Sequence, residues 1–211
     1  MIEKCNIMEV KNVARKRKYS SNIKDKGLLG KELKSAAELY SQGFSFEKIS
    51  TLSIENNIFQ VSTERRRKEL AGCVVTRMKY LDDFTLRKVA GGTIILAGII
   101  SMYAIMKINP FVYEFMNEVY REKAEIMINR ITDTDINQFM DVKSQQVEEV
   151  GKWTDGNKEK VKGALRNMLI EAGLIRDMGS FYMILVPVME TDIVKNLREI
   201  DGDIYLRAMG I

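Results

Sequence analysis

The chain of 211 residues carries 33 Lys and Arg against 29 Asp and Glu, with no His, two Cys and two Pro. The missing histidine excludes His-based acid–base catalysis, Ser-His and Cys-His nucleophile pairs and most zinc sites. Cys5 and Cys73 are too few and too far apart for a disulfide framework, so we expect reduced thiols and a cytoplasmic location. With 45% hydrophobic and 29% charged residues, the composition is typical of a folded protein of one or two small domains.

Positive charge is concentrated at the start of the chain. Residues 1–31 contain nine basic and three acidic side chains, so they carry a net charge of +6, whereas the rest of the chain carries −2. The densest part is the run Arg15-Lys16-Arg17-Lys18. There is no apolar region typical of a secretory signal. We interpret residues 1–25 as a basic arm, which favours a polyanionic partner such as nucleic acid.

Residues 26–108 predict a helical domain that opens with a helix-turn-helix unit. Apolar periodicity, Gly43 as a stop and hydroxyl N-caps define three helices. In order, they are Leu28–Gln42, Phe46–Asn56 after the N-cap Ser45, and a helix from Ser62 or Thr63 to about Leu81. A brief extended link at 58–61 joins the second helix to the third. This order is that of a helix-turn-helix unit with a stretched connection.

The first turns of the third helix carry a run of cations. At about 100° of rotation per residue, Arg65 and Lys68 point outward, Arg66 lies at the flank, and Arg67 lies near the apolar stripe. Recognition helices meet base edges and phosphates with their N-terminal turns. The alternative is a solvated surface, although positive charge at a helix N-terminus is mildly unfavourable for the helix dipole. We therefore favour nucleic-acid contact.

The run Val89–Met106 contains eighteen residues without a charge. Uncharged runs of this length are candidate transmembrane helices. However, several Gly, Ser and Thr residues lower its hydrophobicity, and no tryptophan flanks it. A helix that is apolar on all sides can equally be the central helix of a domain. We favour the buried-core interpretation over the membrane one.

Residues 109–211 predict a second, winged-helix-like domain with a small β-hairpin. A helix over Phe111–Ile126, begun by Pro110, and a short strand at Ile126–Ile131 come first. The remaining elements are a helix capped by Thr132 or Asp133, a short helix or turn at Val147–Trp153, a long helix capped by Thr154 or Asp155 and ending at Ala172, a hairpin of Leu174–Arg176 and Phe181–Val186, and two short helices at about Glu190–Glu199 and Asp203–Met209. Helix, turn, helix and hairpin follow the winged-helix order.

The long helix of this second unit carries a weaker set of candidate DNA contacts. Lys162 and Arg166 point away from the core, and Lys160 lies on a flank, but nearby acidic residues dilute the charge. Winged helices serve as protein–protein modules nearly as often as they bind DNA. Both interpretations of this unit stay open.

The sequence contains no recognisable catalytic, metal or cofactor motif. Asp133-x-Asp135-x-Asn137 begins like an EF-hand loop, but Gln138 stands where the turn needs Gly, and Ser144 where a bidentate Glu belongs. We interpret it as a helix-capping cluster. No phosphate-binding glycine loop is present. We expect a protein that is not an enzyme and uses no cofactor or metal.

Four segments in order resemble one family of proteins. They read ELKSAAELYSQGFSFEKISTLSIENNIFQVSTERRRKEL, NPFVYEFMNEVYREK, KVKGALRNMLIEAGLI and the closing DGDIYLRAMGI. Together they span roughly residues 20–211 and resemble the BrxA family of BREX bacteriophage-exclusion systems. The colinear order of the segments carries the resemblance, since no single motif is unique to that family.

The resemblance implies a mainly α protein with an N-terminal helix-turn-helix domain and a C-terminal winged-helix domain. It implies non-catalytic binding of double-stranded DNA in phage defence, with other defence subunits as partners, and places Thr63, Arg65, Arg66 and Lys68 toward the DNA. Family members have also been labelled inner-membrane proteins and likened to NusB-type RNA-binding factors. Two alternatives therefore remain, an RNA-binding factor and a membrane-associated or scaffold protein, although a membrane partner is not favoured.

Overall fold

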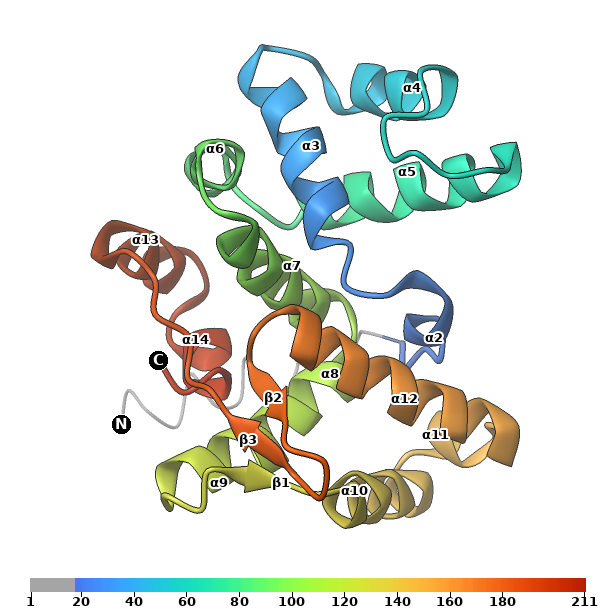
Figure 1. Ribbon diagram of the computed structural model, residues 1–211, viewed down its shortest axis with the longest axis vertical. Helices are drawn as coiled ribbons and strands as arrows, with labels where there is room; N and C mark the ends of the chain where they lie inside the picture. Colours follow the sequence, from blue (N-terminus) through green and yellow to red (C-terminus); the bar gives the residue numbers. More distant parts are fainter. Residues whose placement is uncertain (1–17) are drawn as a thin grey trace.

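Helices dominate the computed structural model, which describes residues 18–211 and contains one small antiparallel sheet (Figure 1). The first helices are α2 (Ile23–Lys26), α3 (Gly30–Ser41), α4 (Phe46–Glu55), α5 (Glu64–Met78), α6 (Asp83–Gly91) and α7 (Ile94–Ile108). The later elements are α8 (Pro110–Phe115), the π-helix η1 (Met116–Tyr120), α9 (Arg121–Glu125), β1 (Arg130–Ile131), α10 (Asp133–Gln146), α11 (Glu148–Gly151), α12 (Asp155–Glu171), β2 (Ile175–Asp177), β3 (Tyr182–Ile184), α13 (Thr191–Asp201) and α14 (Ile204–Ala208). The predicted mainly helical class with a small hairpin is confirmed.

The predicted N-caps of the early helices are present. The Ser45 hydroxyl accepts a hydrogen bond from the Lys48 amide at 3.3 Å, and the Thr63 hydroxyl accepts one from the Arg66 amide at 3.3 Å. The link before α5 is a turn, so the predicted extended conformation is wrong there. Asn57 takes left-handed backbone, and its side chain accepts from the Val61 amide at 3.0 Å. Asparagine tolerates this conformation because its short polar side chain bonds the local backbone.

The apolar run Val89–Met106 is divided between two helices. α6 ends at Gly91, and α7 begins after Thr93, whose hydroxyl accepts from the Leu96 amide at 3.1 Å. Every residue from Ala97 to Lys107 is buried, which agrees with the core interpretation. In residues 18–211 no single helix has the length and hydropathy to cross a bilayer, whereas α7 and the stretch Pro110–Glu125 meet those criteria only as a pair bent by 113°.

α7 is the helix against which both halves of the molecule pack. A Cβ built on Gly30 of α3 would lie 3.0 Å from the Cα of Gly98 in α7, and a Cβ on Gly98 would lie 3.4 Å from the Cα of Ala172. α3 and the end of α12 therefore approach α7 at almost the same residue. One cluster of buried side chains continues from Ile23 to Met209 and includes residues on both sides of the predicted boundary at 108.

The second half adds the sheet and an aromatic core. The strands lie in the order β1-β3-β2, with Arg130 and Arg176 both opposite Met183. The predicted strand over 126–131 is reduced to Arg130–Ile131, because Met127 and Asn129 take left-handed backbone that an extended strand cannot contain. Among the buried aromatic side chains, Phe139 packs at 5.2 Å between ring centres against both Phe111 and Phe115.

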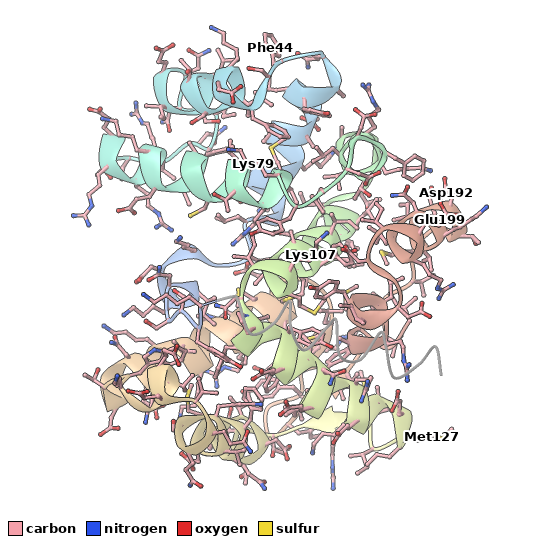
Figure 2. The ribbon with its side chains drawn as sticks, turned by 180° about the vertical axis from the view of Figure 1, so that it is seen from behind. Phe44, Lys79, Lys107, Met127, Asp192 and Glu199 are labelled. Carbon is pink, nitrogen blue, oxygen red and sulfur yellow. The ribbon has the colours of Figure 1, made fainter. Side chains whose placement is uncertain are left out.

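The two buried lysines of residues 18–211, Lys107 and Lys143, are each paired with carboxylates. The Lys143 ammonium lies 2.9 Å from the Glu114 carboxylate and 2.7 Å from that of Glu118. Lys107 lies in the middle of the molecule (Figure 2), 2.6 Å from the Asp201 carboxylate. Asp135 accepts from the Thr132 amide at 2.8 Å, which identifies the acidic run at 133–137 as the predicted capping cluster. Residues 18–211 contain no group of three potential metal ligands.

The packing at Gly98 leads to a prediction about stability. Gly30→Val should destabilise the protein by about 1–3 kcal/mol, because the added methyl groups meet helix backbone that has no room to yield. The measurement is urea unfolding followed by circular dichroism. Gly163→Ala is the control, since a Cβ there meets no other part of the described chain within 4 Å. An unfolding midpoint for Gly30→Val equal to that of the wild type would show that the crossing is not tightly packed.

Candidate nucleic-acid interface

The segment of residues 18–29, here called the strap, crosses from one half of the molecule to the other. Its first part is bound to the second half. The Tyr19 hydroxyl donates to Glu114, the Asn109 amide donates to the Ser20 carbonyl at 3.0 Å, and the Lys24 ammonium donates to the Asn157 side chain at 2.6 Å. Short α2 lies within the strap and packs on α12.

The last part of the strap is bound to α5. Arg66 donates to the carbonyl of Asp25 at 2.9 Å, and Arg77 donates to that of Gly27 at 2.6 Å. Arg77 also donates to the Leu28 carbonyl and, at 3.1 Å, to the Ser101 hydroxyl of α7. Gly27 has a φ of 62°, which only glycine adopts at little cost, so this residue can turn the two carbonyls toward Arg77.

Arg77 is a buried cation for which the described residues provide no carboxylate partner. Within residues 18–211 it forms no ion pair, and its acceptors are two carbonyls and one hydroxyl. Burial lowers the pKa of its guanidinium to about 10, because removal from water disfavours the charged form. At neutral pH the group is still protonated, so it places a positive charge beneath the strap.

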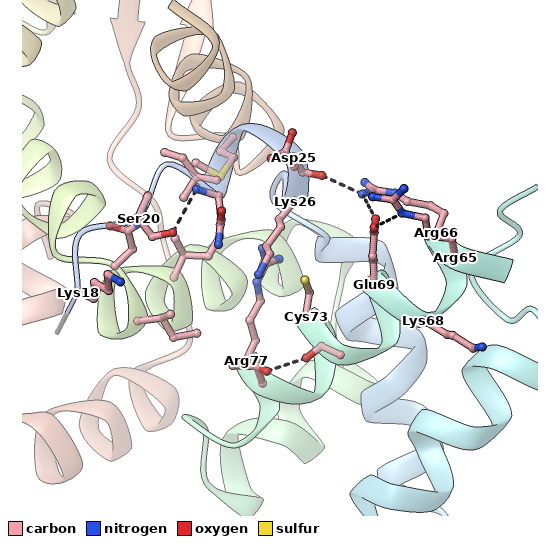
Figure 3. Close-up of a pocket in the computed structure, with 18 residues that line it drawn as sticks. Lys18, Ser20, Asp25, Lys26, Arg65, Arg66, Lys68, Glu69, Cys73 and Arg77 are labelled. Atoms are coloured by element: carbon pink, nitrogen blue, oxygen red, sulfur yellow. Dashed lines mark hydrogen bonds and ion pairs between the residues drawn. The ribbon is translucent and has the colours of Figure 1, made fainter. Parts of the chain in front are cut away.

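A cleft of about 1010 Å³ opens between the strap and α5. Six basic and two acidic side chains line it: Lys18, Lys26, Arg65, Arg66, Lys68 and Arg77, with Asp25 and Glu69. Figure 3 shows Arg66 directed toward Asp25 with Glu69 beside it, and Lys26 above Arg77. The cations predicted for the third helix therefore share one cleft with cations of the strap.

The cations of α5 differ in how freely they extend. The side chains of Arg65 and Lys68 are 90% and 60% exposed, whereas that of Arg66 is 38% exposed. Arg65 pairs with Glu69 at 3.0 Å, and Lys68 pairs with Glu64 at 2.6 Å. Hydrogen bonds from these cations hold the pKa values of Glu69 and Glu64 below their usual range. Exposed pairs of this kind contribute little to stability because water and salt screen them, so a phosphate can replace the carboxylate as partner.

Thr63, a predicted DNA contact, and its neighbour Arg67 both have local structural roles. The Thr63 hydroxyl is occupied as the N-cap of α5, where it accepts from Arg66. Arg67, which was expected near the apolar stripe, is partly buried and donates to the Val61 carbonyl at 3.4 Å. Lys18 belongs to the exposed part of the strap and lines the cleft. The predicted contacts Arg15, Lys16 and Arg17 lie outside the described residues.

The candidate cations of α12 lie apart from this cleft. Lys162 pairs with Glu159 at 2.5 Å and donates to Asn137, while Arg166 pairs with Asp133 at 3.1 Å. Together these groups line a pocket of about 290 Å³ whose two cations are balanced by two carboxylates. Lys160 is exposed on the same helix. The positive charge around this pocket is therefore much weaker than in the cleft beside α5.

Sequence reasoning missed Lys26, Gly72 and Arg77 as members of the cleft. Arg77 left a signal that could have been used, because it lies three residues after Val74 on the apolar stripe of its own helix. A cation at such a position is buried and needs acceptors from another segment. Nothing in the local sequence identifies Gly27 and Leu28 as those acceptors, since they lie 50 and 49 residues away.

Comparisons with known proteins agree with the resemblance found in the sequence. The profile of the BrxA family matches residues 17–201. The chain belongs to the BrxA family. A relative from Bacillus cereus (strain H3081.97), the BREX protein BrxA, is 37% identical over 188 residues, which cover 89% of this chain and 94% of the relative.

A solved structure shares the fold of this BrxA family member. The crystal structure of an uncharacterized protein from Magnetospirillum magneticum superposes with a TM-score of 0.74 and covers 90% of this chain and 97% of that one. Sequence identity over the match is 20%. The arrangement of elements is therefore found in a protein that differs at most positions.

The anchoring of the strap leads to a second prediction. Arg77→Met should lower the free energy of unfolding by about 1–3 kcal/mol, because carbonyls of the strap lose their donors. Arg77→Lys should lose less, since an ammonium still supplies donors without the planar fork. Urea unfolding measures the loss, and hydrogen exchange should show faster exchange at the amides of residues 24–29. Wild-type exchange in that segment for Arg77→Met would contradict the anchoring role.

Proposed function

We propose that this protein is a non-catalytic, cytoplasmic component of a bacterial phage-defence system of the BREX type, and that it binds double-stranded DNA through α5. Membership of the BrxA family and the name of its Bacillus cereus relative support the place in phage defence. The cationic surface of α5 and the strap supports the DNA partner. Other subunits of the same system are the expected protein partners.

The proposal assigns α3, α4 and α5 to a helix-turn-helix unit, with α5 as the recognition helix. The order of elements supports this assignment, because a short helix and a turn precede an N-capped helix rich in cations. An α-helix fits the major groove, which is about 12 Å wide, and contacts bases and phosphates with its N-terminal turns. We assign β1, α10, α12 and the β2–β3 hairpin to a winged-helix unit on the same grounds of element order.

One observation carries the DNA-binding proposal: Arg65 and Lys68 extend from the first two turns of α5 with side chains 90% and 60% exposed. Their partners within the described chain are Glu69 and Glu64 of the same helix, so neither side chain is needed to hold another element in place. Cations with no packing duty at a helix N-terminus oppose the helix dipole. A phosphate partner offsets that cost and forms charge-assisted hydrogen bonds with both side chains.

The experiment that tests the proposal is duplex binding by the double variant Arg65→Ala/Lys68→Ala. Affinity should fall by at least about tenfold, since hydrogen bonds to charged groups contribute about 1.5–3 kcal/mol each. The slope of log affinity against log salt should become shallower by about 0.9 for each phosphate that the variant no longer neutralises. Fluorescence anisotropy of a labelled duplex at several salt concentrations measures both quantities.

The matched control is Arg87→Ala/Lys195→Ala. These two cations are also exposed and also pair with a carboxylate four residues away, but they lie on α6 and α13, outside the cleft. The control removes the same charge and should retain wild-type affinity to within about twofold. Equal losses in both double variants would reject the role of α5. A structured RNA of equal length that displaces the duplex would favour the RNA-binding alternative.

Removing the competing carboxylate should strengthen binding. Glu69 is paired with Arg65 and lies 3.4 Å from Arg66, so it competes with phosphate for both guanidinium groups. Glu69→Gln should raise duplex affinity by about threefold to tenfold, because it frees two cations and removes repulsion of the backbone. Glu199→Gln on α13 is the control, since it leaves the cleft unchanged. Weaker binding by Glu69→Gln would indicate that the carboxylate positions the arginines for DNA binding.

A further inference from the structure

The floor of the cleft leaves space where a helix normally presents a side chain. Gly72 lies in the interior of α5 and lines the cleft. A Cβ built there would meet no other part of the described chain within 4 Å, so packing does not require glycine at this position. Glycine also lowers helix stability relative to alanine. The neighbouring side chains on this face, Cys73 and Thr76, are small as well. The backbone of α5 is therefore open to close approach from the cleft.

Positive charge faces this space from two separate segments. Lys18 and Lys26 belong to the strap, whereas Arg65 and Arg66 belong to α5. In Figure 3, Lys18 lies at one end of the cleft and the two arginines at the other, with Lys26 and Arg77 between them. The cleft has a volume of about 1010 Å³ and cations along its length, so it is larger and more highly charged than a site for a single small anion. An extended polyanion matches this distribution.

Arg77 adds charge from below. Its guanidinium is buried, forms no ion pair within residues 18–211, and lines the floor near Gly72. A buried charge is screened less by water and salt than an exposed one. Arg77 therefore keeps the electrostatic potential in the cleft positive when the exposed cations Arg65 and Lys68 change from a carboxylate to a phosphate partner.

We infer that a phosphodiester backbone passes through this cleft, held between Lys18 and Lys26 of the strap and the arginines of α5, and lying close to the helix at Gly72. This inference rests on the proposed DNA-binding function and extends it, because it places cations of a second segment on the phosphates opposite α5. The protein thereby clamps one strand of the duplex from two sides. Guanidinium groups bind phosphate oxygens in a bidentate manner, which suits the α5 wall of the clamp.

The test adds either volume or a negative charge at Gly72 without disturbing the fold. Gly72→Asp places a carboxylate where the backbone is proposed to lie, and its duplex affinity should fall by at least about tenfold, because like charges then face each other. Gly72→Ala should raise the melting temperature, because alanine has the higher helix propensity, and should lower duplex affinity by a smaller factor than Gly72→Asp, because its methyl group takes up space beside the helix without adding charge. Lys26→Ala should reduce the salt slope by about 0.9.

The control for the added charge is Gly156→Asp. Gly156 lies in the first turn of α12, where a Cβ also meets no other part of the described chain, and it does not line the cleft. Its duplex affinity should equal that of the wild type to within about twofold. Circular dichroism and the melting temperature of each variant show that a loss of binding does not come from unfolding. A loss in Gly156→Asp as large as that in Gly72→Asp would overturn the clamp.

The outcomes separate this inference from the proposed function. Wild-type affinity in Gly72→Asp and Lys26→Ala, together with a loss in Arg65→Ala/Lys68→Ala, would overturn the clamp while the DNA-binding role of α5 stands. A wild-type chain that binds no duplex would overturn both. Inorganic pyrophosphate serves as the small-anion probe. Thermal stabilisation by pyrophosphate equal to that by duplex at the same phosphate concentration would mean a small-anion site and would also overturn the clamp.

Discussion

The surface around α5 depends on the hydrogen bonds that the buried Arg77 guanidinium donates to the strap. The guanidinium joins three segments, because its donors bind the carbonyls of Gly27 and Leu28 in the strap and the hydroxyl of Ser101 in α7. A buried cation needs acceptors, and here backbone carbonyls supply them in place of carboxylates. The strap is therefore held beside α5 without neutralising the charge. Arg77 therefore holds the strap as one wall of the cleft and also contributes to the positive electrostatic potential inside it.

The position of that surface in the molecule follows from close helix packing. α3 and α12 both approach α7 near Gly98, where the absence of side chains lets their backbones come together. This packing fixes α3 relative to α12. The strap connects α12 to α5, because Lys24 is bound to Asn157 of α12 and the Asp25 carbonyl is bound to Arg66 of α5. As a result α5, α2 and α12 lie along one side of the molecule (Figure 1). A ligand on this side meets elements from both halves of the chain.

The ion pairs of the protein divide into two kinds that have different consequences. Lys143 and Lys107 are buried and pair with carboxylates of other elements, so these pairs hold α8, η1, α10, α7 and α13 together. The pairs of α5 are exposed and link residues of the same helix, so they contribute little to the fold. Exchange of Glu64 or Glu69 for a phosphate therefore leaves the fold as it is. The fold therefore does not need Arg65 and Lys68, on which the DNA-binding proposal rests, whereas Arg66 also holds the strap at Asp25.

Features that depend on neighbours within a few residues could be predicted from the sequence alone. The caps at Ser45, Thr63, Thr132 and Thr154 and the outward direction of Arg65 and Lys68 arise from hydrogen bonds or helical rotation within one or two turns. Only the tertiary structure decided that Arg77 is anchored to Gly27, that Lys26 faces α5, and that β1 pairs with β3. These interactions join segments that are distant in the chain, and periodicity carries no information on which distant segment supplies a partner. The cleft exists only because such distant segments meet.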